Sequence, residues 1–285
     1  MTFDEAIAEY LAARRHRQQD SERDRYTLKH LQTHFQGKRL AGLRRIQIRA
    51  YINARLDAGV KLSTVRRELR LFCAAINFVR VEYDLHDLPN PVARLRLAKP
   101  EPRVRWITRE QAISLVKEAE RDAPRPHLAV FIRLALNTGC RRGELLNLEW
   151  SRVDLERGCF LLEAHHTKGR RRRLVPLNAG AIEALRTLAD WQKERELQTP
   201  WVFGWERGKI TTFKTAWTSA LKRAGIENFR IHDLRHTFAS WLVMKGESIY
   251  VVKELLGHAC ITQTEIYAHL APSQGAAAVQ RLEPF

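Results

Sequence analysis

Four short stretches in the second half of the chain place basic, imidazole and phenol side chains at close spacing. They read TGCRRGEL (138–145), TKGRRRRLVPL (167–177), HDLRHTFAS (232–240) and LLGHACITQTEIYAHL (255–270). Together they supply, in order, an arginine, a lysine, a His-x-x-Arg pair, a Gly-His pair and a tyrosine. This set suits phosphodiester transfer without a metal: arginine forks neutralise the phosphate oxygens, tyrosine forms a covalent intermediate, and lysine or histidine protonates the departing sugar oxygen.

Each stretch taken alone has a plainer structural interpretation. Arg141 and Glu144, at i and i+3, could form a surface ion pair on one helical face. Tyr267 could be a core aromatic, and Lys168 could be a solvated charge at a turn. The His-x-x-Arg stretch could be a polar helix face. Only the complete set, in this order, favours catalysis.

The charge of the chain favours a polyanionic partner. Its 285 residues include 49 Lys and Arg against 32 Asp and Glu, a formal charge of +17, although 45% of residues are hydrophobic. The excess is shared, with 20 basic against 11 acidic residues up to residue 100 and 29 against 21 beyond it. No run of 18 apolar residues occurs, and MTFDEAIAEY is too acidic for a signal peptide. We therefore expect a soluble, cytoplasmic, nucleoid-associated protein with no membrane partner.

The cysteines and histidines do not predict a metal site. The four cysteines stand far apart without a CxxC pair (Cys73, Cys140, Cys159 and Cys260). His165 and His166 are adjacent, so on a strand their side chains point to opposite faces. We expect no metal and no other cofactor.

Apolar residues three and four positions apart predict four short helices in the first 85 residues. Their stripes comprise Phe3, Ile7, Tyr10 and Leu11; Leu28, Leu31 and Phe35; Ile48, Ile52 and Leu56; and Val65, Leu69, Phe72, Ile76 and Val79. Ser63 is placed to cap the fourth helix. We expect a compact bundle with arginine-rich outward faces.

A proline-rich stretch, LPNPVARLRLAKPEP (88–102), excludes a continuous helix and predicts a linker. The expected organisation is a helical DNA-binding domain over 1–87, a linker over 88–104 and a catalytic domain with a C-terminal tail over 105–285. Thr108 and Gln111 have capping-box spacing at the start of the second domain. Strand-like runs on both sides of Lys168 and Gly169 predict a β-hairpin, and helical periodicity returns after about residue 212.

The four stretches resemble the motifs of the tyrosine recombinase (phage integrase) family, in family order and with family-like spacing, from about residue 105 to 270. Asn90-Pro91 after a four-helix region resembles, less specifically, the linker that follows that family's core-binding domain. The implied fold is mostly α with a small antiparallel β-sheet: an N-terminal four-helix core-binding domain and a C-terminal α+β catalytic domain.

The resemblance implies a role for each basic residue at the phosphate. Arg141 and Arg235 would be the two catalytic arginines that clamp the scissile phosphate. Lys168 would be the general acid toward the 5′ oxygen. His232 would assist proton transfer, and His258 would hydrogen-bond the phosphate.

The same resemblance makes Tyr267 the nucleophile, which forms a 3′-phosphotyrosyl link and releases a 5′ hydroxyl that attacks the partner strand after exchange. Glu144 would orient neighbouring groups as a supporting residue.

The hairpin is more basic than the family pattern, and Lys168 is its only lysine. The arginines of the hairpin and the one after Arg141 are predicted to contact DNA phosphates: Arg142, Arg170, Arg171, Arg172 and Arg173. The alternative is that they form a solvated surface.

The implied function is site-specific DNA recombination through a phosphotyrosyl intermediate, in integration, excision or chromosome-dimer resolution. The implied partners are a double-stranded DNA recombination site and further copies of the chain, as a tetramer in the synaptic complex and a monomer when free. An accessory DNA-bending protein is a further partner that the resemblance allows.

Three alternatives fit less well. A helical DNA-binding regulator that has lost catalysis would not explain why every catalytic position is filled. A type IB topoisomerase shares the chemistry, but the TG-x-R and LGH forms resemble integrases. A metal-dependent nuclease would need clustered carboxylates, and none stand out near the motifs.

The last segment, APSQGAAAVQRLEPF (271–285), could form a short helix with Ala276, Val279 and Leu282 on one side. So short a helix needs a surface to dock on, either on its own domain or, as in the family, on a neighbouring subunit. Because no segment of about 60 residues precedes the bundle, we expect no separate arm-type DNA-binding domain.

Overall fold

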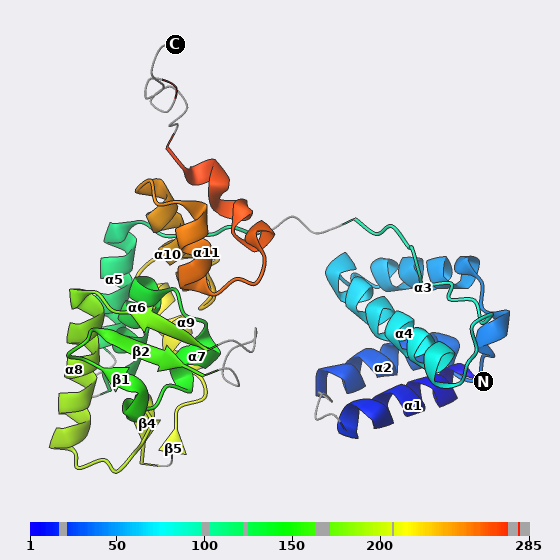
Figure 1. The fold of residues 1–285 in the computed structure, drawn as a ribbon, viewed down its shortest axis with the longest axis horizontal. Coiled ribbons are helices and arrows are strands. Elements are labelled where there is room, and N and C mark those ends of the chain that lie inside the picture. The colour runs from blue at the N-terminus through cyan, green and yellow to red at the C-terminus, as the bar shows by residue number, and fades with distance from the viewer. Residues whose placement is uncertain are drawn as a thin grey trace. The chain divides into compact units, whose positions relative to one another are not determined.

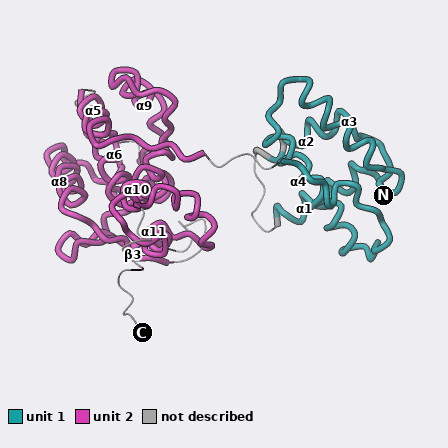
Figure 2. The backbone as a smooth tube through the Cα atoms, turned by 90° about the horizontal axis from the view of Figure 1, so that it is seen from above, with its two compact units in different colours: residues 1–101 teal, residues 102–285 magenta. Residues whose placement is uncertain are grey.

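A computed structural model describes residues 1–16, 22–98, 103–121, 125–163, 172–206, 208–272 and 279. The chain divides into two compact units, residues 1–101 and 102–285, coloured separately in Figure 2. The described residues form mostly helices with small antiparallel sheets, which confirms the predicted fold class.

The N-terminal unit is built from α-helices (Figure 1). These helices bury most residues of the predicted apolar stripes. Its described helices are α1 (Phe3–His16), α2 (Glu22–Phe35), α3 (Arg45–Asp57) and α4 (Leu62–Glu82), with a 3-10 turn, η1 (Leu40–Gly42). Phe3, Phe35 and Phe72 meet at its centre with ring centroids 5.0–5.9 Å apart. Burying each such side chain contributes about 1.5–3 kcal/mol, so this cluster stabilises the bundle.

Two details of this unit differ from the sequence-based expectation. Helix α4 begins at Leu62 after Lys61, which makes no side-chain cap, so the predicted cap at Ser63 is wrong and Ser63 lies in the first turn. The first part of the expected linker packs against the bundle core, with Val92 buried and Leu88, Leu95 and Leu97 partly buried. These apolar side chains, between the prolines, gain more from burial than from remaining in a solvated linker.

The C-terminal unit centres on α6 (His127–Thr138), of whose twelve residues ten are buried. Helix α6 packs against α5 (Arg109–Glu120), α8 (Ala179–Glu194) and α10 (Asp233–Met244). Thr108 and Gln111 form the predicted capping box before α5. The other described helical elements are α7 (Arg142–Leu146), η2 (Trp150–Arg152), α9 (Lys214–Arg223), α11 (Ile249–Leu256), η4 (Ile261–Gln263) and η5 (Glu265–Leu270).

A three-stranded antiparallel sheet runs in the order β1 (Val153–Asp154), β2 (Cys159–Leu162) and β3 (Arg173–Pro176). Strands β2 and β3 pair from Cys159 opposite Pro176 to Leu162 opposite Arg173, which confirms the predicted hairpin strands. The turn that holds Lys168 lies outside the described residues. A smaller sheet pairs β4 (Gly204–Trp205) with β5 (Gly208–Lys209).

The segment that carries Tyr267 docks on α10 and α11. Tyr267 shares a small buried cluster with Ala239 and Val243 of α10 and with Val252 and Leu256 of α11. This cluster fixes η5 against the helix that carries Arg235. None of the described helices is long and apolar enough to cross a membrane.

Candidate active site

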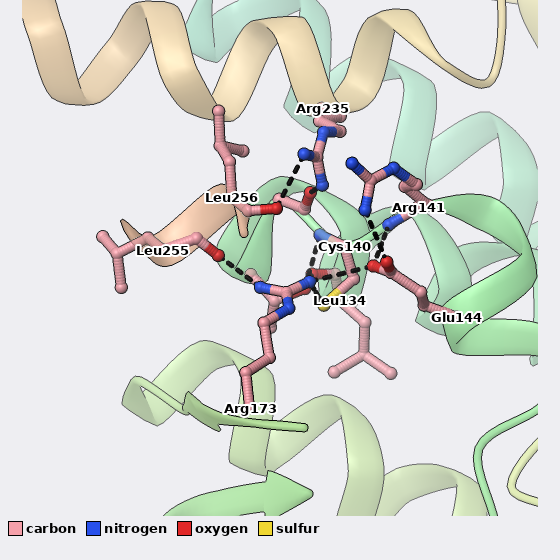
Figure 3. A network of polar contacts seen from close by, with 10 residues as sticks. Leu134, Cys140, Arg141, Glu144, Arg173, Arg235, Leu255 and Leu256 are labelled. Carbon is pink, nitrogen blue, oxygen red and sulfur yellow. Dashed lines mark hydrogen bonds and ion pairs between the residues drawn. The ribbon is translucent and has the colours of Figure 1, made fainter. Parts of the chain in front are cut away.

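Arg235 lies at the centre of the site, on α10, with 3% of its surface exposed. Its guanidinium donates to the carbonyl oxygens of Gly139 (Nη1 to O, 2.9 Å) and Leu256 (Nη2 to O, 2.7 Å). Figure 3 shows the contact with Leu256. Burial, and then the charge of Arg141, lower the pKa of Arg235 to about 10. The side chain is therefore a fixed cation at neutral pH, with two of its five N–H groups donated to carbonyls.

The two carbonyls come from the C-terminal ends of α6 and α11, where helices leave carbonyl oxygens without helical partners. Both helices end at a glycine in the left-handed conformation, Gly139 (φ +64°) and Gly257 (φ +64°). A Cβ on Gly139 would stand 2.3 Å from Cδ1 of Phe238, so the close approach of α6 to α10 requires glycine there. The negative ends of both helix dipoles also favour the cation.

Arg141 is held by Glu144 at the start of α7. The Glu144 carboxylate accepts from the backbone N–H of Arg141 (2.8 Å) and from its Nη1 (2.7 Å). Glu144 is only 1% exposed at its side chain, so this pair is not the surface ion pair that the spacing alone allowed. Burial alone would raise the pKa of Glu144, but Arg173 and the hydrogen bonds from Arg141 bring it below its ordinary value. The carboxylate is therefore ionised and orients Arg141.

Arg173 of β3 joins the same network (Figure 3). Its Nη2 lies 2.9 Å from Oε2 of Glu144 and 3.7 Å from Sγ of Cys140, and its Nη1 donates to the carbonyl oxygen of Leu255. Its side chain is 15% exposed, so the solvated-hairpin alternative does not describe Arg173. The predicted phosphate contact of Arg173 stays a prediction, and the structure adds a second task, the orientation of Glu144.

The other predicted basic residues are more open or lie outside the described residues. Arg172 is 66% exposed and lies 3.5 Å from Glu163, and Arg142 is exposed. The placement of Lys168, Arg170 and Arg171 falls outside the described ranges, so their predicted roles are untested.

The two predicted histidines flank the arginines. Nδ1 of His258, just after α11, lies 2.9 Å from Oγ1 of Thr264. Burial, and then the charges of Arg235 and Arg141, lower the pKa of His258 to about 4, so it is neutral at pH 7. His232 is exposed at the N-terminus of α10, and its ring meets that of His236 edge to face, with centroids 5.1 Å apart.

Tyr267 reaches the site from η5 with 2% of its surface exposed. Its hydroxyl oxygen lies 2.6 Å from Nδ1 of His236. Burial raises the pKa of Tyr267 to about 12, against an opposing effect of Arg235. Tyr267 is thus both the core aromatic and a polar group of the site.

Sequence reasoning missed His236, although it lies inside the quoted stretch HDLRHTFAS. Its position four residues after His232 places both imidazoles on one helical face, and this spacing was the available signal. In the part of the chain that the structure describes, no group of three or more His, Cys, Asp or Glu side chains could hold a metal ion.

Comparison with known proteins identifies the family. Residues 105–274 match the phage integrase family. The integrase of Salmonella phage P22 is 35% identical over 191 residues, which cover 61% of this chain and 46% of that protein, less than half its length. The tyrosine recombinase XerD of Rhizobium meliloti is 32% identical over 239 residues, 78% of this chain and 75% of the relative. A tyrosine recombinase of Thermosipho africanus is 28% identical over 296 residues, 98% of each chain.

Solved structures share the fold. The Tn1549 transposon integrase in complex with circular intermediate DNA superposes with a TM-score of 0.77 at 18% identity, covering 99% of this chain and 100% of that one. A lambda integrase dimer bound to a COC′ core site gives a TM-score of 0.72 at 22% identity, covering 92% and 97%. With the family match over more than half of its length, the chain belongs to the phage integrase family of tyrosine recombinases.

Proposed function

We propose that the chain cuts and rejoins DNA at a specific site through a covalent bond between Tyr267 and a 3′ phosphate. Oη of Tyr267 attacks the scissile phosphorus, the Oη–P bond forms, and the bond from phosphorus to the 5′ oxygen breaks. The freed 5′ hydroxyl then attacks the phosphotyrosyl bond of a partner strand, which rejoins the DNA and releases Tyr267.

The charge balance of the buried network carries this proposal. Among the described residues, the guanidinium groups of Arg141, Arg173 and Arg235 surround the one carboxylate of Glu144, which leaves two positive charges in excess. A phosphodiester under attack carries up to two negative charges on its oxygens. Fixed donors in a poorly solvated site stabilise such charge more strongly than water does, because they need no reorganisation.

The remaining side chains have roles around that phosphate. The donors of Arg141 and Arg235 that do not contact protein groups would take the non-bridging oxygens. His258, held by Thr264, would donate a hydrogen bond from its Nε2, and His232 would assist proton transfer. Lys168 would protonate the departing 5′ oxygen, since an alkoxide is a poor leaving group.

We infer that duplex DNA lies against both units, because both carry an excess of basic residues. Two fold relatives support this substrate and an assembly on it: lambda integrase was solved as a dimer bound to a core site, and XerH was solved bound to a difH substrate. We propose a monomer that pairs on DNA and forms a tetramer at synapsis, with an accessory DNA-bending protein as an optional partner.

The test uses nicked suicide duplexes, in which cleavage loses the short 5′ fragment and traps the covalent complex. The wild-type protein is incubated with a pool of such duplexes whose core sequence is randomised. The duplexes that it traps covalently identify a substrate, so the target sequence need not be specified in advance. Tyr267→Phe should bind the selected duplex and form no adduct. Tyr51→Phe removes the hydroxyl of a buried tyrosine in the other unit and should still form the adduct.

The same assay in EDTA should give an unchanged yield, because arginines carry the charge of the transition state. Adduct formation by Tyr267→Phe, or an absolute requirement for a divalent ion, would overturn the proposed mechanism.

A further inference from the structure

The hydroxyl of Tyr267 has a specific partner that the proposed mechanism leaves without a task. Nδ1 of His236 lies 2.6 Å from the tyrosine oxygen, a short hydrogen bond. His236 follows Arg235 directly on α10, so the partner of the nucleophile and the phosphate-binding arginine move as one rigid element. Tyr267 itself is 2% exposed, which shields this bond from water.

The direction of this bond depends on the charge states of the two groups and on the tautomer of His236. Burial, and then the neighbouring His232, lower the pKa of His236 to about 4, while burial raises the pKa of Tyr267 to about 12. At neutral pH the tyrosine is protonated and the imidazole is neutral, and in the tautomer that proton transfer requires, the hydroxyl donates and Nδ1 accepts. The imidazole proton is then on Nε2.

Charged and titratable groups approach His236 from every neighbouring element. Asp233 favours the protonated imidazole of His236, and the cations oppose it. The groups are His232, Asp233 and Arg235 at the start of α10, Arg103 before α5, His258 after α11 and Tyr267 on η5. Asp233 is 3% exposed at its side chain and accepts from Arg103 (2.9 Å). A bound phosphodiester would offset the cations, and this would make His236 more basic when DNA is present.

We propose that His236 is the base that accepts the proton of Tyr267 as the tyrosine oxygen attacks phosphorus. This inference rests on the proposed function and adds a catalytic residue to it. The O–H bond of Tyr267 breaks, its proton passes to Nδ1 of His236, and the Oη–P bond forms while the bond to the 5′ oxygen breaks. The 5′ oxygen takes its proton from the general acid. In rejoining, His236 returns the proton to Oη, so no charge is left over.

The other imidazoles are less suited to this task. Nδ1 of His258 faces Thr264 at 2.9 Å, and His232 is exposed beside His236 rather than against the tyrosine. A purely structural role for His236, holding Tyr267 in place, is the interpretation that the experiment must separate from proton transfer.

The experiment measures the single-turnover rate of covalent capture of the duplex selected by the wild type, from pH 6 to pH 9, with two variants. His236→Ala removes both the hydrogen bond and the base. His236→Asn places an amide oxygen near the position of Nδ1, so it keeps the hydrogen bond but cannot take a proton. His269→Ala is the matched control, because His269 lies two residues after Tyr267 and is exposed.

We expect both His236 variants to lose about 10²–10⁴-fold in rate at pH 7, with DNA binding retained and His269→Ala unchanged. The rate of His236→Ala should rise about tenfold per pH unit, because the hydroxyl must then lose its proton to solvent, whereas the wild-type rate stays nearly flat. Added imidazole should accelerate His236→Ala and not His236→Asn.

Each outcome separates this inference from the proposed function. Capture by His236→Asn within threefold of the wild type would show that His236 only positions Tyr267, and a wild-type rate in His236→Ala would remove any role. Absence of an adduct from the wild type itself would overturn the proposed function, and this inference with it.

Discussion

Among the described residues, each unit has one fully buried glutamate that pairs with arginine, and the two networks differ in their balance of charge. In the N-terminal unit, Glu68 accepts from Nε and Nη2 of Arg55 (3.1 and 2.7 Å) and from the hydroxyl of Tyr51 (2.7 Å). One anion there meets one cation. In the C-terminal unit, Glu144 faces Arg141 and Arg173, with Arg235 nearby.

This difference separates a balanced network of charges from one with an excess of positive charge. The side chains of Glu68 and Glu144 are both 1% exposed, so both carry a large desolvation cost. The Glu68 network offsets it with matched charge and a third hydrogen bond. The Glu144 network keeps an excess of positive charge that no described anion neutralises, which destabilises the free protein but favours a phosphate.

The two buried tyrosines differ in the same way. Burial and the hydrogen bond to the Glu68 carboxylate raise the pKa of Tyr51, so its phenolate is strongly disfavoured. The hydroxyl of Tyr267 is instead hydrogen-bonded to a neutral imidazole, that of His236. The identity of the partner, and not burial, distinguishes the two tyrosines.

Among the changes that compare the two glutamate networks, the largest effect is expected from replacing an arginine near Glu144 by another cation. Arg235→Lys cannot reach the carbonyls of Gly139 and Leu256 and also present a fork to phosphate. We expect capture of the suicide duplex to fall about 10²–10³-fold while binding in a gel shift changes little. Capture within threefold of the wild type would show that charge alone, without the held fork, is sufficient.

A smaller effect is expected from neutralising the carboxylates one at a time. Glu144→Gln should lower capture about tenfold or more, because Arg141 loses the ionised group that orients it. Glu68→Gln keeps a similar shape in the balanced network, and we expect it to lower stability without changing the capture rate of the folded protein. Denaturant unfolding measures stability, and single-turnover capture measures the rate of adduct formation. Equal losses of capture in Glu144→Gln and Glu68→Gln would show that the two glutamates do not differ in role.

The smallest expected effect is a difference in pH dependence between the units. Because the folded-state pKa values of His236 and His258 are lowered to about 4, the unfolded chain binds more protons between pH 6.5 and 4, and the stability of the C-terminal unit falls as pH drops through that window. We expect its melting temperature to fall by roughly 5 °C or more between pH 7.5 and pH 5.

The tryptophans allow this difference to be measured in the intact chain, because all seven lie beyond residue 102 and report only the C-terminal unit. Glu68 has a lowered pKa, so its contribution is lost only below pH 4.5. The protection factors of α4 amides, which correct observed hydrogen exchange for the pH dependence of intrinsic exchange, should therefore change little over the same range. His236→Asn should reduce the pH dependence of the melting temperature measured by tryptophan fluorescence. Equal pH dependence of stability in both units would contradict the assignment of the effect to His236 and His258.

The sequence predicted what depends on local pattern. The stripe from Val65 to Val79 indicated α4, and the strand-like runs on both sides of Lys168 and Gly169 indicated β2 and β3. The cap at Ser63 was wrong because neighbouring residues compete to start a helix by differences of about 1 kcal/mol. The burial of Val92 was not predicted because it depends on the shape of the completed bundle.

The site was predicted in its residue types and only partly in its contacts. Arg173 reaches Glu144 from 29 positions away, a contact set by the pairing of β3 and not by spacing. His236 and Tyr267 are 31 positions apart, and nothing local to either residue indicates that they meet. Contacts of this kind depend on the packing of η5 against α10.

The most direct test of the central claim identifies the atom that joins protein to DNA. Wild-type protein trapped on the selected suicide duplex is digested with protease and nuclease, and mass spectrometry locates the residue that carries the nucleotide. The account predicts a single modified peptide with a 3′-phosphonucleotide on Tyr267, together with a free 5′ hydroxyl on the released strand. A nucleotide on any other residue, or a 5′ phosphate on the released strand, would contradict it.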